Sequence, residues 1–283
     1  MKTRKLLDFL PNLSGLGKAE GMEDLLGNLR RPSLLLDRFS LDDIQAAVRR
    51  WGIHSALVSR GIDYRVSMDT TNPQRHELHF RLPDGGLLGE LGLAALDYDL
   101  GKLCPWSRGG KAKLLVVQWI RLQDPRRGFG AGVLPLPGQE HPGLGVGHQV
   151  MGLIHAVATD LRLDGVINRP EFLHNAFLYL PHFRFALPEV QGRLDALLRD
   201  VMPIPVVELA WAMESGALRD ESGDTRFQWF KSEQILPVST RLQRMFAGAR
   251  YKLARTAVRK KASFILDQKA LERTMTDLRA RFG

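Results

Sequence analysis

The feature that most constrains this chain is a glycine-rich segment that runs directly into a helical pattern. Within residues 143–147, three glycines alternate with Leu144 and Val146, and the apolar residues of the run from His148 to Leu161 fall mostly on one helical face. A glycine-rich loop at a helix N-terminus presents free backbone N–H groups and the positive end of the helix dipole. Because glycine has no Cβ, an anion can approach closely. The segment predicts a phosphate or pyrophosphate site, and the alternative is a tight turn before a core helix.

Two common nucleotide motifs do not fit the segment. A P-loop requires a Lys-Ser/Thr pair after its last glycine, whereas His148 and Gln149 follow Gly147. The dinucleotide fingerprint spaces its glycines differently and requires an acidic residue about 20 residues further on. The region near position 165 offers only Asp164, beside a glycine. Both motifs are therefore excluded.

Three further elements are predicted after this helix. Asp164 to Asn168 is typical of a short buried strand, and Glu171 to Leu180 predicts a second helix that ends before Pro181. Phe183 to Phe185 then predicts an aromatic strand. This order of loop, helix, strand, short helix and aromatic strand resembles the GNAT superfamily of acyl-CoA-dependent acetyltransferases.

Two motifs carry the resemblance. Pro142 to Gly147 is similar to the R-x-x-G-x-G loop of the family, and Asn175 to Tyr179 with Phe183 and Phe185 is similar to its N-x-x-A-x-x-L-Y-x-x-x-G-F. Pro142 stands where the family usually has Arg or Gln. In the second motif Asn and Ala are adjacent instead of three apart, and the glycine before the final Phe is missing.

The resemblance implies a reaction and a set of roles. An acetyl or other acyl group would pass from acetyl-CoA or another acyl-CoA to an amine acceptor, directly and without a covalent enzyme intermediate. Tyr179 would protonate the departing thiolate, or else it finishes a helix with its ring in the core. Glu140 or His141, beside the loop, is the candidate base. The candidates for binding acyl-CoA are Gly143, Leu144, Gly145, Val146, Gly147, His148, Asn168 and Asn175.

The upstream chain predicts an α/β (α+β) fold with a mixed, mostly antiparallel sheet flanked by helices. Ser40 to Asp43 resembles a capping box that opens a helix ending at Gly52. Asp84-Gly85 separates two apolar runs, Arg75–Leu82 and Leu87–Leu91, and predicts a hairpin. Lys113 to Leu122 predicts a central strand. The residues from 123 to 139 are either an insertion before the glycine loop, or Val133 to Leu136 form the true preceding strand.

Composition indicates an ordinary globular chain. Of its 283 residues, 44% are hydrophobic and 25% are charged, and no apolar run approaches a membrane span. Without a signal-peptide pattern and with a single cysteine, Cys104, a cytoplasmic location is expected. Cys104 is expected to be a buried structural residue. We expect an N-terminal arm over residues 1–38, an acyl-CoA-binding domain over 39–200, and a C-terminal extension over 201–283 containing a helix, a hairpin and a basic helical tail.

The basic charge is concentrated at the C-terminus. Residues 241–283 hold 12 Lys and Arg against three acids, an excess equal to the formal charge of +9 of the whole chain. Leu242, Met245, Tyr251 and Leu253 contribute to an apolar stripe there. Such a helix can bind nucleic acid, an anionic membrane surface or an acidic partner. Otherwise it is a solvated helix that packs on the domain by its stripe.

No metal site is expected, because the histidines lack companion ligands at a suitable spacing. His148 and His155 would lie about 10 Å apart on one helix, too far to share an ion. Three functions remain open from sequence. The chain is an acyl-CoA-dependent N-acyltransferase, a related domain that binds without turnover, or a basic protein that binds nucleic acid or a membrane surface.

Overall fold

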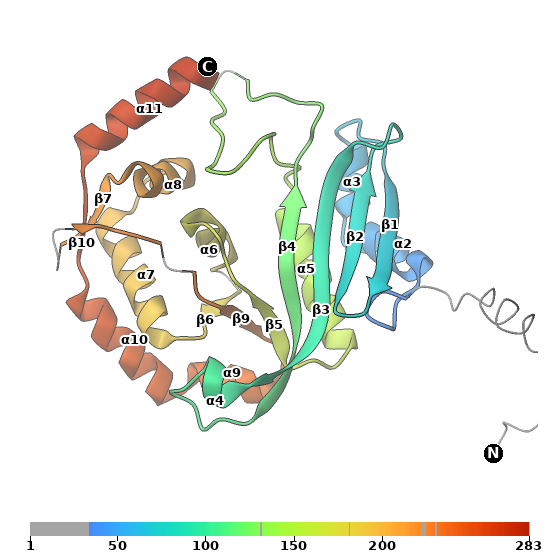
Figure 1. Ribbon diagram of the computed structural model, residues 1–283, viewed down its shortest axis with the longest axis horizontal. Helices are drawn as coiled ribbons and strands as arrows, with labels where there is room; N and C mark the ends of the chain where they lie inside the picture. Colours follow the sequence, from blue (N-terminus) through green and yellow to red (C-terminus); the bar gives the residue numbers. More distant parts are fainter. Residues whose placement is uncertain (1–33, 131, 181, 222–224, 230, 283) are drawn as a thin grey trace, which may run out of the picture. The chain divides into compact units, whose positions relative to one another are not determined.

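A seven-stranded sheet in the order β1-β2-β3-β4-β5-β9-β6 forms the centre of the fold (Figure 1). The computed structural model describes residues 34–283 except 131, 181, 222–224, 230 and 283. Within this part every neighbouring pair of strands is antiparallel except β4 and β5, which confirms the predicted mixed, mostly antiparallel sheet. Most of the predicted N-terminal arm lies outside the described residues. The strands are β1 (Arg65–Asn72), β2 (Arg75–Arg81), β3 (Leu87–Asp99), β4 (Lys111–Leu122), β5 (Gly165–Asn168), β6 (Arg184–Phe185) and β9 (Gln234–Pro237).

The hairpin between β2 and β3 forms at Asp84-Gly85, as predicted. The amide of Leu82 donates to the carbonyl of Gly86, and Gly85 has a φ of 94°, which glycine adopts without strain. The second strand is longer than the predicted Leu87–Leu91 and continues to Asp99. It passes through Gly92, where a Cβ would lie 2.6 Å from the Trp119 indole. The absence of a side chain at Gly92 therefore leaves space for the Trp119 ring of β4 to lie against β3.

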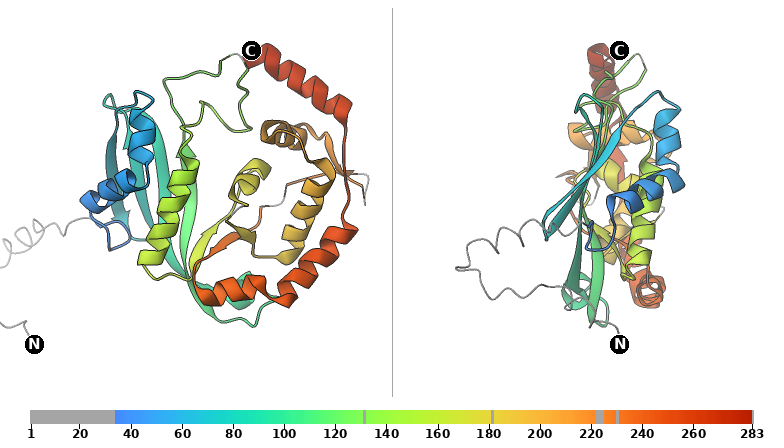
Figure 2. Two further views of the ribbon diagram at one scale, coloured as in Figure 1. Left: turned by 180° about the vertical axis from the view of Figure 1, so that it is seen from behind. Right: turned by 90° about the vertical axis from the view of Figure 1, so that its right-hand side faces the viewer.

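Helices α2 (Leu41–Arg50), α3 (Ile53–Val58) and α5 (Gly147–Asp160) cover one face of β1–β4 (Figure 2). Ser40 caps α2 in the predicted capping box, with its side chain accepting from the amide of Asp43. Apolar side chains such as Ile44 and Ile154 form one buried cluster with side chains of β2, β3 and β4. This packing fixes the position of α5 on the sheet.

The predicted order of loop, helix and strand after β4 is confirmed. Helix α5 buries Val150, Ile154 and Val157 on the sheet and leads into β5, which runs parallel to β4. The short α6 (Leu173–Tyr179) and β6 follow. Two adjacent parallel strands need a crossover connection, which is usually a helix, and α5 is that helix here. The glycine loop at the start of α5 therefore lies at the C-terminal end of β4.

Residues 123–142 form an excursion that closes on itself. The amide of Asp124 donates to the carbonyl of Pro142 at 2.9 Å, and that of Leu144 to the carbonyl of Leu122 at 3.2 Å. Val133–Leu136 is not a strand, so that alternative is wrong. Pro135 and Pro137, with Gly132 and Gly138 on either side, favour turns over a sheet strand. Gly143 thus returns to the end of β4, and β4 is the strand that precedes the glycine loop.

The last third of the chain contributes to both the main sheet and a second one. Strand β9 lies between β5 and β6, although its residues fall in the expected C-terminal extension. The smaller sheet has the order β10-β7-β8. Its strands are β7 (Leu218–Asp220), β8 (Thr225–Arg226) and β10 (Phe264–Leu266). The remaining helices are α4 (Leu100–Leu103), α7 (Pro188–Val201), α8 (Val206–Ser215), α9 (Thr240–Ala247), α10 (Ala249–Lys261) and α11 (Gln268–Phe282).

The expected basic tail is helical but is not one amphipathic helix. Gly248 has an extended backbone (φ −71°, ψ 159°) and separates α9 from α10. The expected stripe is correct for Leu242 and Tyr251, which are buried, and wrong for Leu253, which is 70% exposed. The break turns α10 onto α7, so the apolar positions of the two basic helices do not form one continuous face.

Gly192 on α7 permits the close approach of α10. A Cβ at Gly192 would lie 2.5 Å from the carbonyl oxygen of Arg255 and 2.9 Å from Cβ of Val258. We expect Gly192→Ala to lower the free energy of unfolding by about 1–3 kcal/mol, because overpacking against backbone outweighs the gain in helix propensity. Urea denaturation measures this, with Gly128→Ala, where a Cβ meets open space, as the control. A stabilised Gly192→Ala protein would contradict the expectation.

Candidate functional site

The glycine loop is held by two apolar side chains and exposes the backbone between them. Leu144 and Val146 are 2% and 1% exposed, whereas Gly143, Gly145 and Gly147 are exposed. Gly145 has a φ of 63°, in the left-handed region. The alternation of glycine with apolar residues therefore fixes the loop in the core while it leaves the glycine backbone accessible. Leu144 and Val146 can contact a ligand only through their backbone.

The loop ends in an open helix N-terminus. Val146 is the N-cap of α5 and makes no capping hydrogen bond with its side chain, and the first bond of the helix runs from the amide of Val150 to the carbonyl of Val146 at 3.0 Å. Among the described residues, the amides of Gly147, His148 and Gln149 have no hydrogen-bond acceptor. Together with the helix dipole, these donors form a site for an anion.

Arg60 adds a positive charge to this loop. It follows α3, and its Nη1 donates a hydrogen bond to the carbonyl oxygen of Leu144, 84 residues away in sequence. A Cβ at Gly145 would lie 2.8 Å from both Nη1 and Nη2 of Arg60, so a larger residue here would require the guanidinium to move. Arg60 was not predicted as a site residue. No local motif marks it, because its role depends on the packing of α3 against a distant loop.

A β-bulge in the pairing of β3 with β4 lies just beyond the point where β4 and β5 stop pairing. The strands pair only from Leu114–Gly165 to Val116–Ile167. Immediately beyond, the register between β3 and β4 shifts, so that Gln118 is an extra residue in β4. A bulge bends its strand and increases its twist, and the two strands diverge from this point (Figure 1). Within the described chain, residues 117–121 of β4 have no strand partner on the side of β5, and their backbone groups on that edge are open to a ligand.

Two buried amide side chains lie at the end of β5 without complete hydrogen bonding. Asn168 is the last residue of β5 and pairs in register with Gln234 of β9. The Oδ1 atom of Asn168 and the Oε1 atom of Gln234 are buried and have no hydrogen-bond partner among the described residues, although Nε2 of Gln234 donates to the carbonyl of Ala176. Unpaired buried acceptors are costly. Of these two residues, only Asn168 was predicted to bind a ligand.

Tyr179 ends α6 near the start of α5. Its ring lies 5.7 Å from that of Phe183 and packs against the cluster that contains Leu144 and Val146. The rings of His182, just after α6, and of His148, in the first turn of α5, are 6.1 Å apart. Burial raises the pKa of Tyr179, and its hydroxyl has no hydrogen-bond partner among the described residues. The contact between the two histidines thus places the end of α6, which carries Tyr179, beside the first turn of α5.

The other predicted residues lie at the edges of this region. Glu140 is exposed, and Nδ1 of His141 lies 3.2 Å from the carbonyl oxygen of Arg127. Asn175 is half-buried on α6 and makes no hydrogen bond with the described residues. No hydrogen bond or ion pair joins any of the three to Tyr179. Their assignment to catalysis or binding stays a prediction.

Cys104 is a buried residue of the core, as predicted. It is 0% exposed, and burial raises the pKa of its thiol to about 12. A thiol that stays protonated at neutral pH is a poor nucleophile. Burial also lowers the pKa of His174 on α6 to about 4, so this imidazole stays neutral. Within the described residues, no group of three or more His, Cys, Asp and Glu is placed to hold a metal ion.

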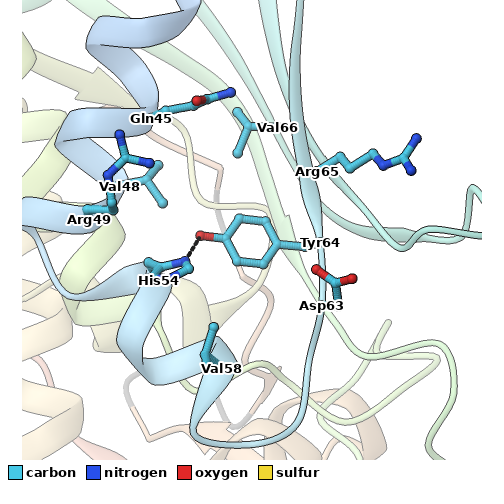
Figure 3. Close-up of a pocket in the computed structure, with 9 residues that line it drawn as sticks. All are labelled: Gln45, Val48, Arg49, His54, Val58, Asp63, Tyr64, Arg65 and Val66. Atoms are coloured by element: carbon cyan, nitrogen blue, oxygen red, sulfur yellow. Dashed lines mark hydrogen bonds between the residues drawn. The ribbon is translucent and has the colours of Figure 1, made fainter.

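A separate polar recess of about 400 Å³ lies between α2, α3 and β1 (Figure 3). Nδ1 of His54 lies 3.0 Å from the hydroxyl of Tyr64, and burial raises the pKa of that tyrosine. The recess is lined by charges of both signs, including Arg49 and Asp63. None of its lining residues belongs to the glycine loop, and the mixed charge does not select an anion.

Comparison with known proteins finds no matching protein-family model and no matching curated protein. Several solved structures show distant similarity, among them these three. A bacterial toxin is 9% identical (TM-score 0.30, covering 61% of this chain and 70% of that chain), and nourseothricin acetyltransferase is 15% identical (TM-score 0.29, 63% and 86%). AtaT complexed with acetyl-methionyl-tRNAfMet is 8% identical (TM-score 0.27, 47% and 72%). Similarities this low assign neither a family nor a function to the chain.

No helix among the described residues has the length and apolar character needed to cross a membrane.

Proposed function

We propose that the protein transfers an acetyl or other acyl group from acyl-CoA to an amine. The observation that carries the proposal is the open N-terminus of α5. Its free amides directly follow the exposed glycine backbone and lie beside the guanidinium of Arg60. This arrangement suits a pyrophosphate, and it lies at the Leu122 end of β4, beyond the point where β4 and β5 separate.

The residues present fit the rest of an acyl-CoA molecule. The amides of residues 147–149 and the guanidinium of Arg60 would hold the pyrophosphate. The open edge of β4 at residues 117–121 would hydrogen-bond the amide groups of the pantetheine arm. The buried oxygens of Asn168 and Gln234, which have no partner in the part of the chain that the structure describes, would accept from N–H groups of the ligand. The pyrophosphate and the pantetheine arm are thus each assigned protein groups of the matching kind.

Acyl-CoA would supply an activated thioester carbonyl, and the side chains would move the protons. The amine nitrogen forms a bond to the carbonyl carbon, the carbon–sulfur bond breaks, and the thiolate leaves with its electron pair. The hydroxyl of Tyr179 donates a proton to that sulfur. Glu140 or His141 accepts the proton that the amine loses. With Nδ1 of His141 donating to the carbonyl of Arg127, its Nε2 carries the free lone pair that a base requires.

Calorimetric titration with acetyl-CoA tests the proposal. Binding with a micromolar dissociation constant is expected, followed by turnover in a screen of amine acceptors. Acetylpantetheine, which lacks the pyrophosphate, is the matched ligand and should bind far more weakly. An absence of binding to acetyl-CoA and to longer acyl-CoAs would overturn the proposal. Binding without turnover on any amine would leave a module that binds acyl-CoA and does not catalyse transfer.

Arg60→Ala tests the charge at the glycine loop. The dissociation constant for acetyl-CoA should rise about tenfold, because a charge-assisted hydrogen bond to phosphate is lost. Arg65→Ala, on the exposed start of β1, removes the same charge without touching the loop and should change the constant less than about twofold. Equal effects of the two variants would show that only net charge matters.

A further inference from the structure

The excess charge of the C-terminal segment gathers in part around one groove. The groove has a volume of about 700 Å³ and lies between the turn that follows α4, the start of α9 and the junction of α9 with α10. It is lined by Leu100, Trp106, Ser107, Arg108, Gly109, Thr240, Arg241, Arg244, Met245, Gly248, Ala249 and Arg250. Its size is that of a small-ligand site.

Four arginines line this groove and no acidic residue does. One of them, Arg241, already has partners. Its Nη2 lies 3.1 Å from Oδ1 of Asp164 and donates to the carbonyl of Lys111. The guanidinium groups of Arg108, Arg244 and Arg250 form no ion pair and no hydrogen bond with any described residue. Three guanidinium groups around one groove repel one another, and an anion between them would reverse that cost.

Helix α10 begins at the same groove. Gly248 is its N-cap without a side-chain cap, and its first bond runs from the amide of Lys252 to the carbonyl of Gly248. The amides of Ala249, Arg250 and Tyr251 therefore have no acceptor within the described chain. These donors and the positive end of a 13-residue helix add to the field of the arginines.

We propose that this groove binds the phosphate groups of a small, nucleotide-sized ligand. Guanidinium groups match phosphate oxygens in bidentate geometry, and free amides at a helix start complete such a site. The volume favours a small molecule over a long strand of nucleic acid. The site is distinct from the glycine loop. The groove adjoins the Lys111 end of β4 and the loop adjoins its Leu122 end, about 35 Å along the 12-residue strand. The proposal does not rest on acyl transfer.

Titration with adenosine triphosphate without magnesium, at low salt, tests the groove. The double variant Arg244→Ala/Arg250→Ala should bind at least about tenfold more weakly than the unaltered protein. Lys260→Ala/Lys261→Ala removes the same charge from the far end of α10 and should bind within about twofold. Because all four side chains are exposed, both variants should unfold at the same temperature as the unaltered protein. Binding should also survive Gly145→Glu, which affects only the glycine loop.

The opposite results would overturn the proposal. Undetectable binding of adenosine triphosphate would do so, as would equal losses in the two double variants, which would show a general charge effect. Loss of binding in Gly145→Glu would place the nucleotide at the glycine loop instead. A short oligouridylate titrated in parallel tests whether the groove binds the phosphates of a nucleic-acid backbone instead of those of a small nucleotide. If it binds through Arg244 and Arg250 while the nucleotide does not, the groove takes a nucleic-acid backbone and the small-ligand proposal is wrong.

Discussion

Gly145→Glu is expected to abolish acetyl-CoA binding, with a dissociation constant at least about 100-fold higher. Three effects combine at this position. The φ of 63° is strained for a residue with a Cβ, and that Cβ would lie 2.8 Å from the guanidinium nitrogens of Arg60. The new carboxylate also places a negative charge where the amides of α5 would hold a pyrophosphate. Calorimetric titration of the purified variant measures the loss.

A second glutamate separates this local effect from net charge. Gly130→Glu lies in the excursion before the loop, where a Cβ meets no atom within 4 Å and φ is not positive. It makes the same change in charge and should bind acetyl-CoA within about twofold of the unaltered protein. Circular dichroism should show both variants folded. If folded Gly145→Glu bound acetyl-CoA normally, the loop would be only a turn before a core helix.

Tyr179→Phe is expected to lower kcat by about 100-fold or more while the dissociation constant for acetyl-CoA changes less than about twofold. The hydroxyl would donate the proton to the leaving thiolate, and loss of a positioned acid costs this much. Phenylalanine keeps the aromatic ring, which packs against Phe183 and belongs to the apolar cluster that contains Leu144 and Val146. Single-turnover kinetics with a responsive amine, together with calorimetry, distinguishes the two quantities.

The pH dependence gives an independent check on Tyr179. Burial raises its pKa above the ordinary value near 10, so the protonated form required of a donor persists at neutral pH and is lost only above that value. The unaltered protein should lose activity in this alkaline range, and Tyr179→Phe should lack that decline. Tyr64→Phe removes another half-buried hydroxyl, bonded to His54, and should leave kcat unchanged. An unchanged kcat in Tyr179→Phe would remove this residue from the mechanism.

Local patterns in the sequence predict much of the fold correctly. The helix after the glycine loop, β5, the β2–β3 hairpin and the capping box at Ser40 each depend on residues close together in the chain. Hydrophobic periodicity, turn chemistry and capping act over a few residues, so a single sequence contains them. The role of Tyr179 has a different basis, because it is implied only by the resemblance to a known family, and it stays a prediction.

The parts that could not be predicted depend on distant contacts. Arg60 contacts a loop 84 residues away, and no residue near it in sequence indicates that contact. Gln234 reaches the site because β9 inserts between β5 and β6. The bulge at Gln118 is visible only in the register with β3. Burial of Tyr251 but not Leu253 likewise follows from the turn at Gly248 and from the packing of α10 on α7.

The excursion of residues 123–142 leaves the end of β4 and returns to the same place, which gives the protein a region of evolutionary freedom. Loop closure costs rise slowly with length, so descendants of this chain could lengthen or shorten it without moving β4 or α5. The far part is nonetheless held, since Trp211 donates to the carbonyl of Pro135 and the ring of Phe129 lies 5.9 Å from that of Phe282. A change of length there would therefore have to keep these two contacts, which hold the far part of the excursion against α8 and α11.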